Sequence, residues 1–123
     1  MRGDMIAGSI LVLITKPPYG LEEAFAGLRL ALAMSVNGMK TSVLMMEDGV
    51  YNAVATQKPE AVRMPSNIEA TKELYDFDVP VYVVKEDMAA RGIPDLKLFE
   101  GLKPIPASDV KKLLAEHDLA TTF

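Results

Sequence analysis

The sequence predicts a three-layer α/β/α sandwich built on a mainly parallel sheet. Short, uninterrupted apolar runs rich in branched residues, typical of strands covered on both faces, alternate along the chain with segments of helical periodicity. This alternation favours right-handed crossovers, which make neighbouring strands parallel and place helices on both faces of the sheet. The chain has 123 residues and 50% of them are hydrophobic, so a single domain over residues 1–123 can bury one core.

The first strand is expected at Ser9–Thr15 (SILVLIT), in the centre of the sheet, after residues 1–8, which we expect to form a flexible tail. A pair of prolines ends this strand, because proline cannot continue its hydrogen-bonding pattern. Residues 21–37 then carry apolar side chains at helical spacing, and Gly38 suits the position that closes a helix.

The remaining elements follow from the same criteria. Strands are predicted at Thr41–Glu47 and Val79–Val84, helices from Ser66 to about Asp76, from Glu86 to Arg91 and from Ser108 to Glu116, and a terminal strand at Leu119–Phe123. Ser66 and Glu69 have the spacing of a capping box, which marks a helix start. The polar, proline-containing stretch from Asn52 to Pro65 is predicted to be a long loop near any site.

The helix predicted at 21–37 has two apolar stripes, and one sheet cannot cover both. The second stripe consists of Ala26, Leu30, Ala33 and Met34. A helix that is apolar nearly all round is usually buried on both sides. The second stripe therefore predicts either a subunit interface or contact with a neighbouring helix of the same chain.

Composition excludes several classes of function. Thirteen Lys and Arg residues against 17 Asp and Glu residues give a net charge of −4, and no basic run is present that could bind a row of phosphates, so direct nucleic-acid binding is not expected. No apolar run approaches the roughly 18 residues that a membrane span requires. The apolar segment from Met5 to Thr15 lacks a signal-peptide cleavage site and is interpreted as a strand, so we expect a cytoplasmic protein.

The chain contains no Cys, which excludes disulfides, thiolate metal sites and every thiolate nucleophile. Its one His, His117, rules out an imidazole-rich metal site, and we expect it to have a structural or helix-capping role. No cofactor, metal or catalytic residue is predicted on these grounds.

The candidate pocket lies where the predicted strands end, because ligands of an open parallel sheet collect at the carboxyl ends of its strands. Its candidate residues are Lys16, Pro18, Tyr19, Gly20, Asp48, Gly49, Tyr51, Asn52 and Lys85. Gly20 leaves helix-start amides free to hold an anion or a backbone loop, whereas the alternative is tight turns that need Gly and Pro for shape alone. Glu47 and Asp48 would point to opposite faces of a strand, so Asp48 is expected to cap the following turn.

Ordered motifs extend over nearly the whole chain, from Ile10 to Phe123. They are Pro-Pro-Tyr-Gly at 17–20, Asp-Gly-Val-Tyr-Asn at 48–52, Gln-Lys-Pro-Glu-Ala-Val at 57–62, Arg-Gly-Ile at 91–93 and Asp-Leu-Ala-Thr-Thr-Phe at 118–123. In these motifs the chain resembles the DsrE/DsrF-like sulfur-relay family, and most closely its TusC/DsrF branch. The resemblance implies a DsrEFH-like, flavodoxin/Rossmann-like fold with five parallel strands, and assembly into trimers or hexamers, often of related but different subunits.

The same resemblance implies a chemistry that this chain lacks. Family members pass persulfide sulfur toward tRNA thiolation or take part in sulfur oxidation, and active subunits carry a Cys at the end of a central strand. Alignment backwards from Arg91-Gly92 places Val84 at that position, which adds Val84 to the candidate pocket. Val84 cannot hold a persulfide, because sulfur relay requires a thiolate.

The first hypothesis is therefore a non-catalytic subunit or binding module of a DsrE/DsrF/TusC-like sulfur-relay assembly, not itself an enzyme. Its partners would be further copies of itself, in a trimer or hexamer, or cysteine-bearing DsrE/TusD-like subunits. A second hypothesis is a small-ligand (nucleotide or anion) binding protein, or a thiol-independent enzyme, with Lys16, Asp48, Asn52 and Lys85 as polar contacts. A third is a homo-oligomeric structural protein without a ligand.

Overall fold

The computed structural model describes residues 8–18, 23–54, 67–94 and 97–123. The elements follow in the order β1 (Ser9–Ile14), α1 (Glu23–Val36), β2 (Lys40–Met45), the 3-10 helix η1 (Glu47–Ala53), α2 (Asn67–Tyr75), β3 (Val81–Val84), α3 (Lys85–Ala90), β4 (Lys103–Ile105), the 3-10 helix η4 (Ala107–Asp109), α4 (Val110–Ala115) and β5 (Leu119–Thr122). No helix among these residues is long and apolar enough to cross a membrane.

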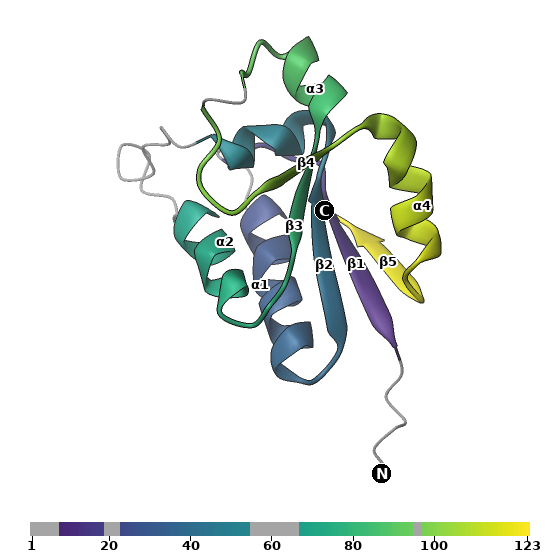
Figure 1. Cartoon of the computed structure of the whole chain (residues 1–123). Coiled ribbons are helices and arrows are strands. Elements are labelled where there is room, and N and C mark those ends of the chain that lie inside the picture. Colours follow the sequence, from purple (N-terminus) through teal and green to yellow (C-terminus); the bar gives the residue numbers. More distant parts are fainter. Residues whose placement is uncertain (1–7, 19–22, 55–66, 95–96) are drawn as a thin grey trace.

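One five-stranded sheet, in the order β4-β3-β2-β1-β5, forms the middle layer, and all of its strand pairs are parallel. α1 and α2 lie on one face of the sheet and α4 lies on the other (Figure 1). The short η1 and α3 sit above the carboxyl ends of the strands, at the top of that view. The predicted fold class is confirmed, including the central position of β1 between β2 and β5.

Two apolar layers lie on the two faces of the sheet. The main core fills the space beneath α1 and α2 and includes Val12 and Ile14 from β1. A smaller cluster beneath α4 is made of Leu11, Leu44, Val84 and Leu113, with partly buried neighbours. Because successive side chains of a strand point to opposite faces, the continuous apolar run of β1 supplies both layers.

Hydrogen bonds join β5 to β1 at both ends of the strand pair. At the start of β5, the carboxylate of Asp118 accepts a hydrogen bond from the backbone N–H of Ser9 at 3.0 Å. At its end, the Phe123 carbonyl oxygen accepts from the backbone N–H of Thr15 at 2.7 Å and from the Thr15 hydroxyl at 2.6 Å. These bonds fix the register of the last strand against the first.

Several elements differ from the sequence-based predictions. β4 was not predicted from residue patterns, because it has three residues, lies at the sheet edge and contains Pro104. β2 stops at Met45 rather than Glu47, since Glu47 has a φ of 53°, in the left-handed region, and begins η1. Asn52 and Ala53 belong to η1, not to the predicted loop. The loop's residues 55–65, and the Ser of the capping box, lie outside the described residues.

The second stripe of α1 is only partly covered. Met34 packs against the main core and Leu30 is half-buried, whereas Ala26 and Ala33 are exposed. His117 lies just after α4, and its Nδ1 is 2.8 Å from the carbonyl oxygen of Leu113 while its Nε2 is 3.0 Å from the Ser42 hydroxyl. These contacts agree with the structural role expected of this side chain.

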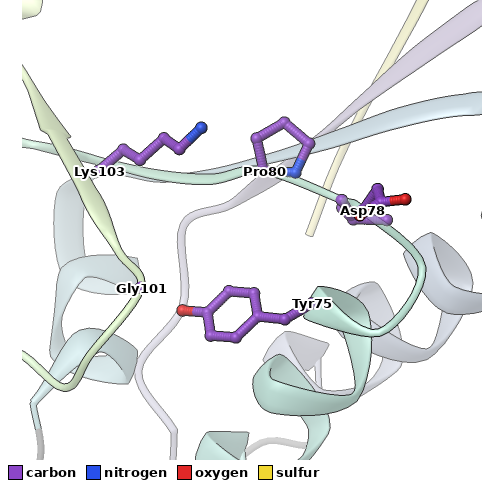
Figure 2. Close-up of a pocket in the computed structure, with 6 residues that line it drawn as sticks. Tyr75, Asp78, Pro80, Gly101 and Lys103 are labelled. Carbon is purple, nitrogen blue, oxygen red and sulfur yellow. The ribbon is translucent and has the colours of Figure 1, made fainter.

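Tyr75, the last residue of α2, points toward the loop before β4 (Figure 2). A Cβ added at Gly101 would lie 2.6 Å from its ring, so glycine allows the close approach. The Tyr75 hydroxyl is buried and has no hydrogen-bond partner within the described part of the chain. Burial raises the pKa of Tyr75 from its ordinary 10.0 to about 12, because it disfavours the charged tyrosinate.

We expect Tyr75→Phe to remove part of the protein's loss of stability at high pH. In the wild type, the unfolded chain releases the Tyr75 proton above pH 10.0 whereas the folded chain keeps it to about 12, so stability falls across this interval. The substitution also removes a buried hydroxyl without a partner, which should raise the free energy of unfolding at neutral pH by up to about 1 kcal/mol. Urea unfolding at neutral and alkaline pH measures both effects. An unchanged alkaline slope would contradict the burial of this hydroxyl.

Candidate functional site

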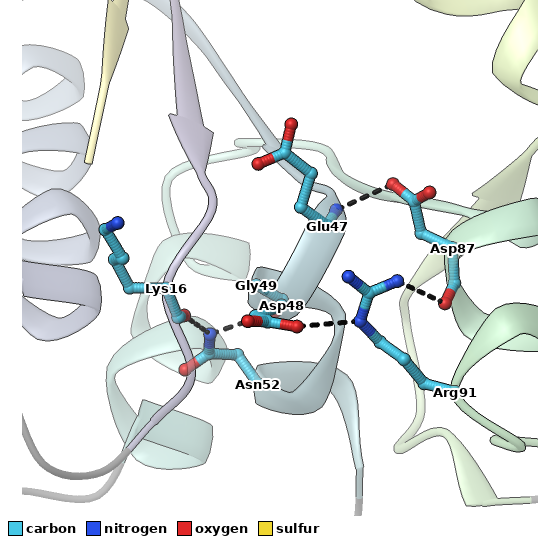
Figure 3. A network of polar contacts seen from close by, with 7 residues as sticks. All are labelled: Lys16, Glu47, Asp48, Gly49, Asn52, Asp87 and Arg91. Atoms are coloured by element: carbon cyan, nitrogen blue, oxygen red, sulfur yellow. Dashed lines mark hydrogen bonds and ion pairs between the residues drawn. The ribbon is translucent and has the colours of Figure 1, made fainter.

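A network of polar contacts joins η1 to α3 above the carboxyl ends of β2 and β3 (Figure 3). Arg91 donates from Nε to the Asp48 carboxylate at 2.9 Å and from Nη1 to the carbonyl oxygen of Asp87 at 3.1 Å. The carboxylate of Asp87 in turn accepts a hydrogen bond from the backbone N–H of Glu47 at 2.6 Å. The contacts cross between two segments about forty residues apart, so they fix the two sides of the strand-end region relative to each other.

This network places a permanent positive charge beside two carboxylates. The hydrogen bond to Asp48 raises the pKa of Arg91 above its ordinary value, and the negative charges of Asp48 and Asp87 add to the effect. The Asp48 side chain is 58% exposed and that of Arg91 24%, so the ion pair faces solvent. Exposed pairs contribute little to stability, and this one orients groups at the surface. Asp48 thus pairs with Arg91, whereas η1 has no side-chain cap of the kind expected from Asp48.

Asn52 holds three elements together from inside the protein. Its amide nitrogen donates to the carbonyl oxygens of Lys16 at 2.8 Å and Gly49 at 2.9 Å. Its side-chain oxygen accepts from the amide of Asn67, the first residue of α2, at 2.7 Å. Because Asn52 is 0% exposed, its amide stabilises the end of β1, η1 and α2 against one another.

The other candidate residues are spread along the same edge of the sheet. Lys16 is exposed, and its ammonium group points away from Asp48 and Arg91 (Figure 3). Lys85 is also exposed and opens α3, while Pro18 and Tyr51 are half-buried. Tyr19 and Gly20 lie outside the described residues.

Val84 is the last residue of β3, immediately before α3. It is 2% exposed and belongs to the apolar cluster under α4, together with Leu44 and Leu113. The position at which we expect the family's Cys is therefore filled by a side chain that is enclosed by other apolar side chains.

Gly49 allows η1 to rest directly on the end of β1. Its backbone N–H donates to the carbonyl oxygen of Met46 at 2.8 Å. Any Cβ at this position would collide with the carbonyl oxygen of Ile14. The Asp-Gly motif singled out in the sequence thus has a steric reason: only glycine permits this close backbone approach.

Arg91 was not selected as a pocket residue from the sequence, whereas Asp87 falls within residues 85–87, which follow a predicted strand and were expected to line the pocket. The partners of Asp87 and Arg91 lie across the sheet, so these contacts depend on β2 and β3 being neighbours. A local signal was present, since an acidic and a basic residue four positions apart fall on the same side of a helix. Arg91 also lies in the Arg-Gly-Ile motif.

A parallel sheet between helices, with its polar network at the strand ends, is the architecture of a class of small α/β proteins, and sequence comparison identifies the family. The profile of the DsrE/DsrF-like family matches residues 8–123, and the chain belongs to this family. The resemblance drawn from the motifs is thereby confirmed.

The relatives of this chain include proteins of methanogenic archaea. The uncharacterized protein MJ0989 of Methanocaldococcus jannaschii is 34% identical over 112 residues, which cover 91% of this chain and 96% of that protein. The uncharacterized protein MK0008 of Methanopyrus kandleri is 29% identical over 114 residues, covering 93% of each.

Solved structures share the fold. The ychN protein from E. coli superposes with a TM-score of 0.85 at 26% identity, covering 95% of this chain and all (100%) of that one. The protein MTH1491 of unknown function from Methanobacterium thermoautotrophicum superposes with a TM-score of 0.73 at 11% identity, covering 94% of this chain and 98% of that one. The second likeness shows the fold alone.

Gly49→Ala should destabilise the protein strongly, by about 2–3 kcal/mol, because the new methyl group forces η1 away from the end of β1. Gly38→Ala is the matched control: Gly38 has a φ of 93° but no atom within 4 Å of the place that a Cβ would take, so only backbone strain of about 1 kcal/mol applies. Urea unfolding of both variants measures the difference. Equal losses would contradict the close contact between Gly49 and Ile14.

Proposed function

We propose that this chain is a non-catalytic subunit or binding module of a DsrE/DsrF/TusC-like sulfur-relay assembly, with no persulfide chemistry of its own. One observation carries the proposal: the chain of 123 residues contains no Cys, and a buried Val84 ends β3, where we expect the family's Cys. Membership of the DsrE/DsrF-like family supplies the setting.

Sulfur relay needs a thiolate that can attack a persulfide and later release the sulfur. Val84 offers no such group. Its surroundings are also unsuited to one, since a thiol enclosed by Leu44 and Leu113 would be shielded from a partner and, in an apolar environment, would favour its protonated form. The absence of a thiol and the burial of Val84 therefore both support a role through binding to other subunits.

The contribution we infer is a contact surface at the strand ends. We call Lys16, Asp48, Lys85 and Arg91 the strand-end surface; all four belong to the same edge of the sheet, and three of them are exposed. The network with Asp87 holds the Asp48–Arg91 pair in place before any partner arrives. A surface that is already ordered loses less conformational entropy on binding.

The outer stripe of α1 is the proposed assembly contact. Ala26 and Ala33 are exposed small residues beside the half-buried Leu30 and Met34, so a helix or loop of another subunit can approach closely. The partners would be further copies of this chain, in a trimer or hexamer, or cysteine-bearing DsrE/TusD-like subunits. The proposed setting is the cytoplasm, where the assembly would serve tRNA thiolation or another branch of sulfur metabolism.

Val84→Cys tests whether the strand end is closed, because it places one thiol in a chain that has none. We expect this thiol to react with a disulfide reagent at least about tenfold more slowly than the thiol of Lys85→Cys, since Val84 is buried and Lys85 exposed. The reaction rates of the two folded variants give the comparison. Similar rates would show an open strand end and contradict the closed site.

The assembly is tested with the full chain and a cysteine-bearing DsrE/TusD-like subunit from the same cell, using size-exclusion chromatography with light scattering. We expect one mixed complex. Asp48→Ala and Arg91→Ala should weaken it, as should Ala33→Glu on α1, whereas the exposed controls Arg29→Ala and Ala115→Glu should not.

A strictly monomeric chain that forms no complex with such a subunit would refute the proposed function. So would a pure chain that accepted sulfane sulfur covalently on one of its own side chains. Mass spectrometry after incubation with a persulfide donor detects the second outcome.

A further inference from the structure

A hollow of 410 Å³ lies on the α4 face of the sheet, at the opposite end of the strands from Val84 and Arg91. It is lined by Lys40, Ser42, Pro80, Tyr82, Leu113, Glu116 and His117. Lys40 begins β2 and Pro80 precedes β3, so the hollow lies toward the amino ends of these strands. Its volume is within the roughly 300–1,000 Å³ of pockets that hold small molecules.

The hollow exists because the layer over this face of the sheet is short. α4 has six residues, and among the described helices it alone packs against the cluster of Leu11, Leu44 and Val84. Ser42 and Tyr82 lie two positions before Leu44 and Val84 on the same strands, so they continue the same face beyond the cluster. A smaller hollow of 160 Å³ shares Tyr82, Leu113 and Glu116 and extends the space along α4.

The polar end of the hollow is built from groups that are held in place. The Leu113 carbonyl oxygen can only accept a hydrogen bond, so Nδ1 of His117 donates to it, and Nε2 lies 3.0 Å from the Ser42 hydroxyl. With a carboxylate bound, a proton on Nε2 would be donated to the Ser42 oxygen, which leaves the Ser42 O–H free to donate to the ligand. Ser42 is 3% exposed, yet it reaches the hollow. Lys40 adds a positive charge to the same lining, so an anion would meet a cation and one hydroxyl donor.

The remaining walls set the size and charge of a ligand. Pro80, Tyr82 and Leu113 offer apolar surface, and Lys103 holds its ammonium group 5.9 Å from the centre of the Tyr82 ring. Glu116 is a carboxylate on the rim, which would repel a second negative charge on a ligand. This combination favours a singly charged anion with an apolar body over a phosphate or a polyanion.

We propose that this hollow binds a small organic monocarboxylate, with the carboxylate at Lys40 and Ser42 and the apolar part against Pro80, Tyr82 and Leu113. The site is separate from the strand-end surface and does not depend on the function proposed above. Lys40 provides charge, and the Ser42 hydroxyl provides the hydrogen bond. The ring of His117, whose orientation is set by Leu113, positions that hydroxyl.

The test uses benzoate as the probe and benzamide as its uncharged equivalent of nearly the same shape, each titrated into the full-length protein and followed by the NMR signals of Ser42, Tyr82 and His117. We expect benzoate to shift these signals saturably and benzamide to shift them far less. Lys40→Met should weaken benzoate binding about tenfold, since it removes one charge-assisted contact. Lys111→Met, an exposed lysine of α4 that does not line the hollow, should leave affinity unchanged.

Three results would overturn the proposal: no saturable shift with benzoate, equal binding of benzoate and benzamide, or equal affinities of the wild type and Lys40→Met. The first would show that the hollow takes no such ligand, and the other two that charge does not select it. Ser42→Ala is a second variant for the polar end, and unfolding curves confirm that each variant is folded.

Discussion

The burial of β1 on both faces is the constraint on which the rest of the structure depends. Leu11 and Val12 are fully buried on opposite sides, and β2 and β5 occupy both hydrogen-bonding edges of the strand. The backbone groups of β1 pair with these two neighbours, and its side chains are apolar on both faces. Helices must therefore cover both faces of the sheet at this strand. The end of β1 is also the support for η1, through the Gly49–Ile14 contact and the Asn52 amide. The strand-end network therefore rests, through η1, on a strand that is buried on both faces.

The sequence was sufficient for the elements whose side chains are covered on both faces. The runs predicted at Ser9–Thr15, Thr41–Glu47 and Val79–Val84 correspond to the three inner strands, because buried parallel strands are continuously apolar. β4 has only three residues, with a proline among them, and no residue pattern predicted it. Only the five strands implied by the family resemblance made a further strand expected. The observed end of β2 differs from the predicted one because Glu47 has a left-handed backbone conformation. The spacing of apolar residues does not reveal such a single-residue feature.

The candidate site was predictable in position but not in its pairings. Asp48, Gly49 and Lys85 follow strands, and the topology rule alone locates them. The use of each was set by contacts distant in sequence: Asp48 meets Arg91 across β2 and β3, and the amide of Asn52 faces inward to Lys16 and Gly49. The hollow under α4 gave no sequence signal, since it results from the shortness of one helix and the neighbourhood of Ser42 and His117, 75 residues apart. Family membership shows the fold but does not supply the chemistry, because the chain belongs to the DsrE/DsrF-like family and contains no Cys.

The pairing of the last strand, β5, with the first, β1, has a consequence for the rate of folding. Ser9 and Asp118 are 109 residues apart, so β1 gains its second neighbour only after the chain has closed a loop of nearly its full length. Such distant parallel pairing is slow, because the entropy of closing the loop is lost before the new contacts form. During synthesis, β1 therefore leaves the ribosome well before β5 and waits for this neighbour. A molecular chaperone that shields this apolar segment would raise the yield of folded protein.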